Sequence, residues 1–212
     1  MAQPPPRTIV YVDGFNFYYG TVRRTPWKWL DPEALFRTLL EPRNAIVRVK
    51  YFTARVQPSP ADPGVHERQA AYLRALDAHC PLLDLHFGHF LRHRVRMEHA
   101  SPPPPRVEVW KNEEKGSDVN LALHVVNDAW LNAYDCAVIV SNDSDLAEAL
   151  HLVKTQHGKL IGLVTPGAPQ RKTSNQLRKH VDFVKPIRTW MLRSSQLPDL
   201  IPGTSIHKPP GW

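Results

Sequence analysis

The stretch from Lys115 to Leu146 constrains the fold most, because its acidic residues stand where regular elements begin and end. Residues 117–131 have the apolar spacing of a helix, with Asp118 in the first turn. Cys136-Ala-Val-Ile-Val-Ser141 is an apolar run typical of a buried strand, and Asn142-Asp143-Ser144-Asp145 follows it directly. The pattern predicts an α/β fold in which the acids mark the ends of elements.

A second apolar strand also ends in an acid, since residues 8–12 are β-branched or aromatic and stop at Asp13-Gly14. Strand-like runs alternate with helical segments along the chain, which predicts a mainly parallel sheet with right-handed crossovers. Groups just past the carboxyl ends of such strands face one crevice. We therefore expect four carboxylates to meet there: Asp13, Asp118, Asp143 and Asp145.

Four carboxylates in one crevice repel each other and stay ionised together only when cations neutralise them. Hard oxygen donors suit Mg²⁺ or Mn²⁺ better than zinc or copper. We expect Asp13 and Asp143 to be direct ligands, with Asp118 and Asp145 completing the shell directly or through water. The alternative for each acid alone is a helix cap, which is the commoner role of an acid at such a position.

Polar and basic residues near these acids suit metal-assisted hydrolysis of a phosphodiester. Asn16 belongs to the predicted catalytic set, Ser141 and Ser144 would orient ligands or water, and Lys115 would hold a phosphate oxygen; Glu113 and Glu114 have a smaller claim to the same rim. Other candidate contacts to substrate are Arg23, Arg24, Arg171 and Lys172. Trp27 and Trp29, beside the first pair, could stack bases or equally pack a loop onto the core.

The net charge of +7 favours a polyanionic partner such as a nucleic acid. Residues 166–212 carry eight Lys or Arg against Asp182 and Asp199, so most of the excess lies there. No apolar run approaches the ~18 residues that span a membrane, and residues 1–6 have no signal core, so we expect a cytoplasmic protein without membrane contact. A homodimer is one assembly that the sequence allows.

Cys80 and Cys136 lie in apolar surroundings without CxxC spacing, which predicts two reduced core thiols. Four histidines (His86, His89, His93 and His99) are interpreted as solvated or packing residues, not as metal ligands.

The expected domain covers residues 7–190, preceded by a disordered Pro-rich lead over residues 1–6. A strand is expected over residues 82–90. Basic and apolar residues alternate around Ser101-Pro-Pro-Pro-Pro105, which predicts a hairpin excursion over residues 90–111. Residues 191–212 form a Pro-rich basic tail without periodicity, which we expect to be mobile.

Three blocks of this sequence resemble those of the NYN domain, a PIN-like nuclease family, and specifically its bacterial LabA-like branch. They are Asp-Gly-Phe-Asn-Phe-Tyr (13–18), Lys-Gly-Ser-Asp-Val-Asn-Leu-Ala-Leu (115–123) and Ser-Asn-Asp-Ser-Asp-Leu (141–146). The order and spacing fit, and a closing segment is matched at Ser174, Leu177, Asp182 and Phe183. The resemblance extends from about Arg7 to Ile187.

The resemblance implies a PIN-like three-layer α/β/α fold with a central, mainly parallel sheet, and a metal-dependent ribonuclease activity. The family's acidic positions fall on Asp13, Asp118, Asp143 and Asp145, and its polar position falls on Asn16. Asn142 and Leu146 stand where Gly and Phe are frequent in the family, and the region 90–110 has no counterpart in it. Fold and activity separate readily, so two alternatives remain: a non-catalytic RNA- or DNA-binding regulator, and a small-molecule enzyme of a metabolic pathway.

Overall fold

The structure, a computed structural model, describes residues 4–40, 42–58, 60, 62–167 and 172–212. Part of the N-terminal lead, residues 1–3, lies outside the described residues. The core of the fold is one six-stranded sheet in the order β3-β2-β1-β6-β7-β8, and every pairing in it is parallel. Its strands are β1 (Arg7–Asp13), β2 (Ala45–Thr53), β3 (Leu83–Phe87), β6 (Cys136–Val140), β7 (Leu160–Thr165) and β8 (Phe183–Pro186).

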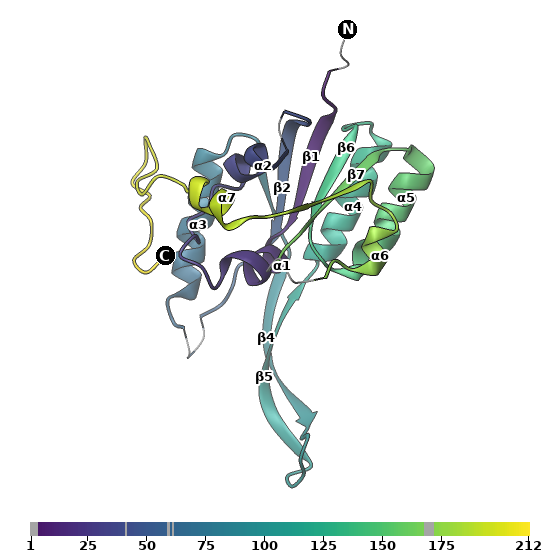
Figure 1. Cartoon of the computed structure of the whole chain (residues 1–212). Helices are drawn as coiled ribbons and strands as arrows, with labels where there is room; N and C mark the ends of the chain where they lie inside the picture. Colours follow the sequence, from purple (N-terminus) through teal and green to yellow (C-terminus); the bar gives the residue numbers. More distant parts are fainter. Residues whose placement is uncertain (1–3, 41, 59, 61, 168–171) are drawn as a thin grey trace.

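Helices cover both faces of this sheet (Figure 1). On one side lie α2 (Pro32–Leu40), α3 (Val65–His79) and α7 (Thr189–Ser194), and on the other α4 (Ser117–Trp130), α5 (Ala147–His157) and α6 (Asn175–Arg178). Successive strand residues point to opposite faces: Val10 and Val12 belong to the core under α2 and α3, whereas Ile9 and Tyr11 belong to the core under α4 and α5. The predicted PIN-like three-layer α/β/α architecture is confirmed.

The two central strands, β1 and β6, meet where the direction of winding reverses. From β1 the chain moves outward through β2 to β3, then returns to β6 and moves outward again through β7 to β8. Such a reversal leaves a crevice past the carboxyl ends of the two central strands. β1 runs into α1 (Gly14–Phe17) and a π-helical turn, η1 (Tyr18–Val22), while β6 runs through Ser141 to Asp143 into a 3₁₀ turn, η2 (Ser144–Leu146).

A two-stranded antiparallel hairpin, β4 (His89–Glu98) and β5 (Arg106–Lys115), extends from the carboxyl edge of the sheet (Figure 1). The prediction of one strand over residues 82–90 is wrong, because β3 ends at Phe87 and β4 begins at His89. Gly88 lies between them where chains approach closely: a Cβ there would stand 2.6 Å from the carbonyl oxygen of Lys115. The hairpin therefore starts and ends beside the crevice.

The C-terminal segment packs on the core, so the expectation that it is mobile is wrong. Leu197 and Ile201 are buried, and Trp29 Nε1 donates a hydrogen bond of 2.9 Å to the carbonyl oxygen of Pro198. Trp212 contacts Trp29 and Tyr72, with ring centroids 6.3 and 5.5 Å apart. The sequence did not indicate this packing, because the segment is largely irregular backbone held by separate contacts such as the bridge between Leu30 and Gln196. Trp29 is thus a core residue, and Trp27 packs against the same core.

Both thiols are reduced and buried, as predicted for Cys80 and Cys136. Among the described residues, none of the helices combines the length and the apolar character that crossing a bilayer requires.

Candidate active site

Asp13 is the last residue of β1 and is only 4% exposed. Its Oδ1 accepts a hydrogen bond of 2.9 Å from the backbone N–H of Asn16, and its Oδ2 accepts one of 2.8 Å from Ser141 Oγ. The residue is therefore a helix cap as well as a candidate ligand. Burial raises the pKa of Asp13, the two hydrogen bonds oppose that rise, and Asp143 and Glu114 add to it.

Asp143 and Asp145 reach the crevice from the end of β6. Asp143 Oδ1 accepts a hydrogen bond of 3.0 Å from the backbone N–H of Asp145, so Asp143 caps η2. The fully buried Ser141 joins the two central strands: its hydroxyl donates to Asp13 and accepts the backbone N–H of Asp143 at 3.1 Å. Ser141 thereby fixes Asp13 and Asp143 relative to each other, whereas the side chain of Ser144 is exposed.

Asp118 comes from a third element, the first turn of α4. Gly116 turns the chain from β5 into this helix with a φ of +92°, a backbone conformation that favours glycine. Burial, and after it the charges of Asp13, Asp143, Glu114 and Asp145, raise the pKa of Asp118 to about 7. The structure thus brings all four predicted aspartates into one electrostatic neighbourhood.

Glu114 joins this cluster more closely than the sequence suggested. Its Oε1 accepts a hydrogen bond of 3.0 Å from the backbone N–H of Ser117, and its charge raises the pKa of both Asp13 and Asp118. The spacing of three residues between Glu114 and Ser117 is a local signal that could have been used. Glu113, in contrast, pairs with Lys111 at 2.5 Å on the hairpin.

The predicted substrate contacts lie around the rim and not among the acids. Lys115 Nζ lies 3.8 Å from Glu113, and its side chain is largely exposed. The backbone carbonyl of Lys172 accepts a hydrogen bond of 3.3 Å from Asn142 Nδ2, which places this segment beside the end of β6. Arg171 lies outside the described residues.

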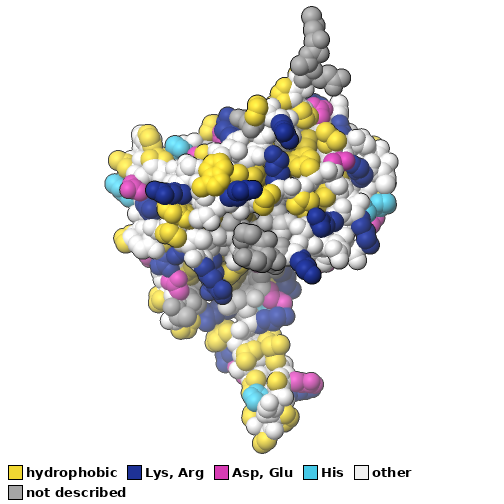
Figure 2. Space-filling model, viewed as in Figure 1, with side chains coloured by type: hydrophobic (Ala, Val, Ile, Leu, Met, Phe, Trp, Pro, Cys, Tyr) yellow, Lys and Arg dark blue, Asp and Glu magenta, His cyan; other side chains and the backbone are white. Residues whose placement is uncertain are grey.

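A separate groove holds the other predicted contacts. Arg23 and Arg24 line it together with Arg188, which arrives from the C-terminal part of the chain. Arg23 also lies over the ring of Tyr19, 5.1 Å from its centroid. Figure 2 shows Lys and Arg side chains spread over the visible face of the domain, not gathered in one patch.

The acid cluster has the donor chemistry for a hard divalent cation. In the part of the chain that the structure describes, no three His, Cys, Asp or Glu side chains are already arranged around one point that an ion could occupy. Mg²⁺, however, usually keeps several waters and binds through one or two carboxylates. Two buried oxygens beside the acids, Asn16 Oδ1 and Ser117 Oγ, have no hydrogen-bond partner among the described residues. Such oxygens fit a hydrated cation better than they fit a closed core.

A buried polar network that the sequence did not reveal joins α4 to the sheet. Asp128 accepts hydrogen bonds from Tyr11 Oη at 2.7 Å and from Lys50 Nζ at 2.6 Å. His86 stacks between Phe52 and His124, at centroid distances of 4.8 and 4.3 Å, so it packs at the sheet. The network ties β1 and β2 to the helix that carries Asp118.

Comparisons with known proteins agree on the fold and differ in the activity they suggest. The NYN domain model matches residues 7–187. A protein of Pseudomonas putida (strain DSM 28022 / S16) named 6-hydroxy-3-succinoylpyridine 3-monooxygenase HspA is 35% identical over 236 aligned positions, covering 98% of this chain and 76% of that protein. The crystal structure of VPA0982, a protein of unknown function from Vibrio parahaemolyticus RIMD 2210633, superposes with a TM-score of 0.55 at 16% identity, covering 93% of this chain and 99% of that one. The last similarity concerns the fold alone.

Proposed function

Since the chain belongs to the NYN domain family, we propose that it is a divalent-cation-dependent phosphodiester hydrolase that cuts RNA in the cytoplasm. One observation carries the proposal: acids from three separate elements meet at the reversal point of the sheet, where burial and the neighbouring carboxylates raise the pKa of Asp13 and Asp118. Keeping like charges together disfavours the folded state. A bound cation would remove the repulsion between the carboxylates, and this relief would contribute to the affinity for the cation.

Asp13 and Asp143 would hold Mg²⁺ or Mn²⁺, because the Ser141 hydroxyl binds the carboxylate of Asp13 and the backbone N–H of Asp143 at the ends of the central strands. Such an ion lowers the pKa of a bound water and offsets charge on the phosphoryl oxygens. Asp118 and Asp145 would orient water on the opposite side of the crevice, and Asn16 would present its unpartnered amide oxygen to the same water shell. Glu114 would keep α4, and so Asp118, in position.

The hairpin gives a route for a nucleic acid strand toward this crevice. In the register of β4 and β5, Phe90 faces Glu114 and Arg94 faces Trp110, so one face of the hairpin runs from the acids to an exposed basic and aromatic surface. Arg94 lies over the Trp110 ring, 5.6 Å from its centroid, and Arg96 follows on the same face. Exposed aromatic and basic side chains together bind single strands by stacking and charge, which supports RNA as the substrate.

The test compares cleavage of labelled single-stranded and hairpin RNA in Mn²⁺ and in EDTA. We expect products only with the metal, and none from Asp13→Asn or Asp143→Asn. Asp77→Asn, an exposed acid on α3 far from the crevice, is the matched control and should cleave like the wild type. Cleavage that survives both crevice substitutions would refute the assignment. Salt-sensitive RNA binding without any product would instead support a regulator.

The second candidate is an enzyme that acts on a small aromatic molecule. It is favoured by the relative named 6-hydroxy-3-succinoylpyridine 3-monooxygenase, whose similarity covers almost the whole chain. A monooxygenase consumes O₂ and a two-electron reductant, so the test is oxygen uptake with NADH and 6-hydroxy-3-succinoylpyridine. Uptake that depends on this compound, with no RNA product under any metal condition, would replace the first proposal.

A further inference from the structure

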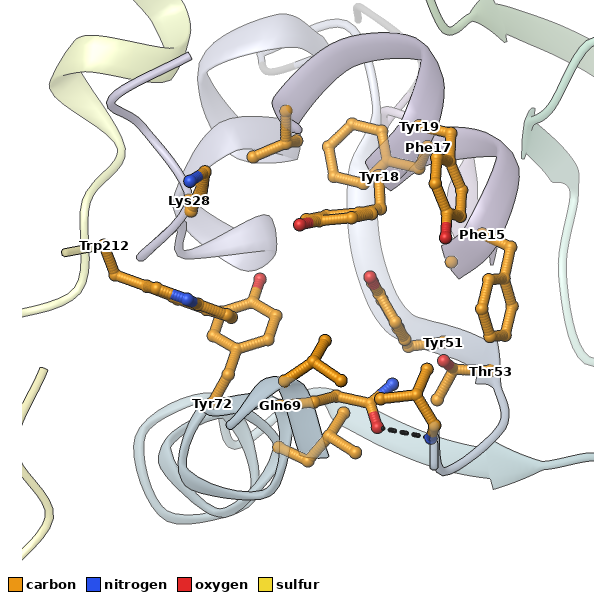
Figure 3. A pocket seen from close by; sticks show the side chains of 15 residues that line it. Phe15, Phe17, Tyr18, Tyr19, Lys28, Tyr51, Thr53, Gln69, Tyr72 and Trp212 are labelled. Carbon is orange, nitrogen blue, oxygen red and sulfur yellow. Dashed lines mark hydrogen bonds between the residues drawn. The ribbon is translucent and has the colours of Figure 1, made fainter. Parts of the chain in front are cut away.

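A pocket with a mainly aromatic wall lies directly behind the turn that carries Asp13 (Figure 3). It has a volume of about 90 Å³, and Gly14 forms part of its lining. Phe15 and Tyr18 come from the segment after β1, Tyr51 from β2, Tyr72 from α3, and Trp212 from the end of the chain. A cavity walled by ring faces suits a flat, apolar body.

Two phenol groups in this pocket lack protein partners. Tyr51 is 5% exposed, yet no hydrogen bond of its hydroxyl, or of the Tyr18 hydroxyl, is found within the described residues. Figure 3 shows both hydroxyl oxygens pointing toward the middle of the pocket. Tyr72 differs, since its hydroxyl donates to the carbonyl oxygen of Leu30 at 2.9 Å. Because neither hydroxyl is used within the described protein, both are available to donate a hydrogen bond to a ligand in the pocket.

Both phenols are donors at neutral pH. Burial raises the pKa of Tyr51, with the charge of Asp13 adding to the rise, and burial likewise raises the pKa of Tyr18. Neither group therefore carries a negative charge that would repel an anion.

Lys28 supplies a positive charge at the same pocket. Its side chain is part of the lining, and no ion pair joins Lys28 to a carboxylate among the described residues. A half-buried ammonium without a counter-ion attracts an anionic group. The hydroxyls of Tyr18 and Tyr51 and the ammonium of Lys28 can all interact favourably with a carboxylate. The pocket therefore favours a ligand that carries one.

We propose that this pocket binds a small planar aromatic acid, with the ring between the aromatic walls and the carboxylate toward Lys28. Its size limits the occupant to a single ring: an apolar cavity of roughly 150 Å³ holds benzene, so a pocket of about 90 Å³ encloses only part of the ring, and the rest of the ring and the carboxylate must lie in the open mouth. The site is distinct from the acid cluster, although the turn at Asp13 and Gly14 borders both. It requires neither a metal nor RNA cleavage.

Calorimetric titration in EDTA tests the proposal with three probes: benzoate, benzamide and acetate. We expect one benzoate per chain, benzamide bound about tenfold more weakly for want of the charge, and no binding of acetate, which has no ring. Lys28→Met should weaken benzoate about tenfold and leave benzamide unchanged. Lys179→Met, an exposed residue beyond α6, is the matched control and should bind benzoate like the wild type.

Two further variants keep the test decisive. Tyr51→Phe should weaken both ring-bearing probes, because it removes a hydrogen-bond donor while preserving the ring. Asp143→Asn should bind benzoate as the wild type does, which separates this pocket from the proposed hydrolase site. Failure of benzoate to bind at millimolar concentration, or unchanged benzoate affinity in Lys28→Met, would overturn the proposal whatever the outcome of the RNA assay.

Discussion

Replacing Asp118 by Asn should stabilise the metal-free protein at alkaline pH. In the folded state burial and four neighbouring acids raise the pKa of Asp118 to about 7, whereas the unfolded chain releases this proton near 3.8. Between these values the folded state binds more protons than the unfolded state, so the free energy of unfolding falls as pH rises. The contribution is fully present below the unfolded value and is lost above the folded one.

The size of the effect follows from the same shift. A rise from 3.8 to about 7 has an upper limit of ~4 kcal/mol. Asp118 is only partly buried, and solvent screening reduces the electrostatic cost of such groups, so we expect about 1–2 kcal/mol. Asn carries no charge at any of these pH values and escapes the penalty.

Urea unfolding in EDTA at pH 4, 6 and 8 measures the difference. Asp118→Asn should match the wild type at pH 4 within about 0.5 kcal/mol and exceed it at pH 8 by about 1–2 kcal/mol. The variant should keep a weaker pH dependence, since burial also raises the pKa of Asp13. Asp77→Asn, with its exposed side chain, should follow the wild type at every pH.

Adding Mn²⁺ at pH 8 should reverse the order of stability of the wild type and Asp118→Asn. The cation neutralises the crowded carboxylates only where they are present, so the wild type should gain more stability than Asp118→Asn. A variant that is no more stable than the wild type at pH 8 in EDTA would show that the acids do not repel one another as the structure indicates. The metal proposal would then lose its physical basis.

Three further predictions concern the surroundings of the site. Gly14→Ala should lower stability by about 1–3 kcal/mol in urea unfolding, because its Cβ would lie 2.6 Å from the carbonyl oxygen of Phe52; unchanged stability would mean that the turn is less tightly packed. Ile201→Ala should cost about 2–5 kcal/mol, since the side chain is 1% exposed, whereas a mobile tail would make the substitution neutral. Arg94→Ala should reduce the slope of log affinity against log salt for single-stranded RNA by about 0.7, with Arg178→Ala as the control that should leave the slope unchanged.

The arrangement of the acids could be predicted because local pattern and sheet geometry agree. Asp13 and Asp143 each follow an apolar run, and parallel strands end at the same edge, so only the neighbouring of β1 and β6 had to be assumed. Predicting the position of Asp118 required one more assumption, because this residue reaches the edge of the sheet from the start of a helix. The resemblance to the family supplied the order of these blocks.

Features held by long-range contacts could not be predicted. Residues 195–212 have no periodicity, yet Trp29 and Tyr72 hold them through side chains 140 to 183 residues away in sequence. The break at Gly88 reflects the approach of β5, which no window around residue 88 contains. The aromatic pocket takes its walls from the segment after β1, from β2, from α3 and from the last residue, so no motif could encode it.

The two functional suggestions therefore rest on different parts of one edge of the sheet. Family membership accounts for the acids, while the similarity to a protein named as a monooxygenase of an aromatic ring concerns nearly the whole chain. The fold alone does not decide between the two functions, because one fold can carry different active sites.

The turn at Asp13 and Gly14 borders both sites, because Asp13 belongs to the acid cluster and Gly14 lines the pocket. Asp143 contacts only the first through Ser141, and Lys28 lines only the second. Substitutions at Asp143 and Lys28 consequently separate the proposed RNA cleavage from the proposed binding of an aromatic acid, whereas a change at Gly14 would disturb both together.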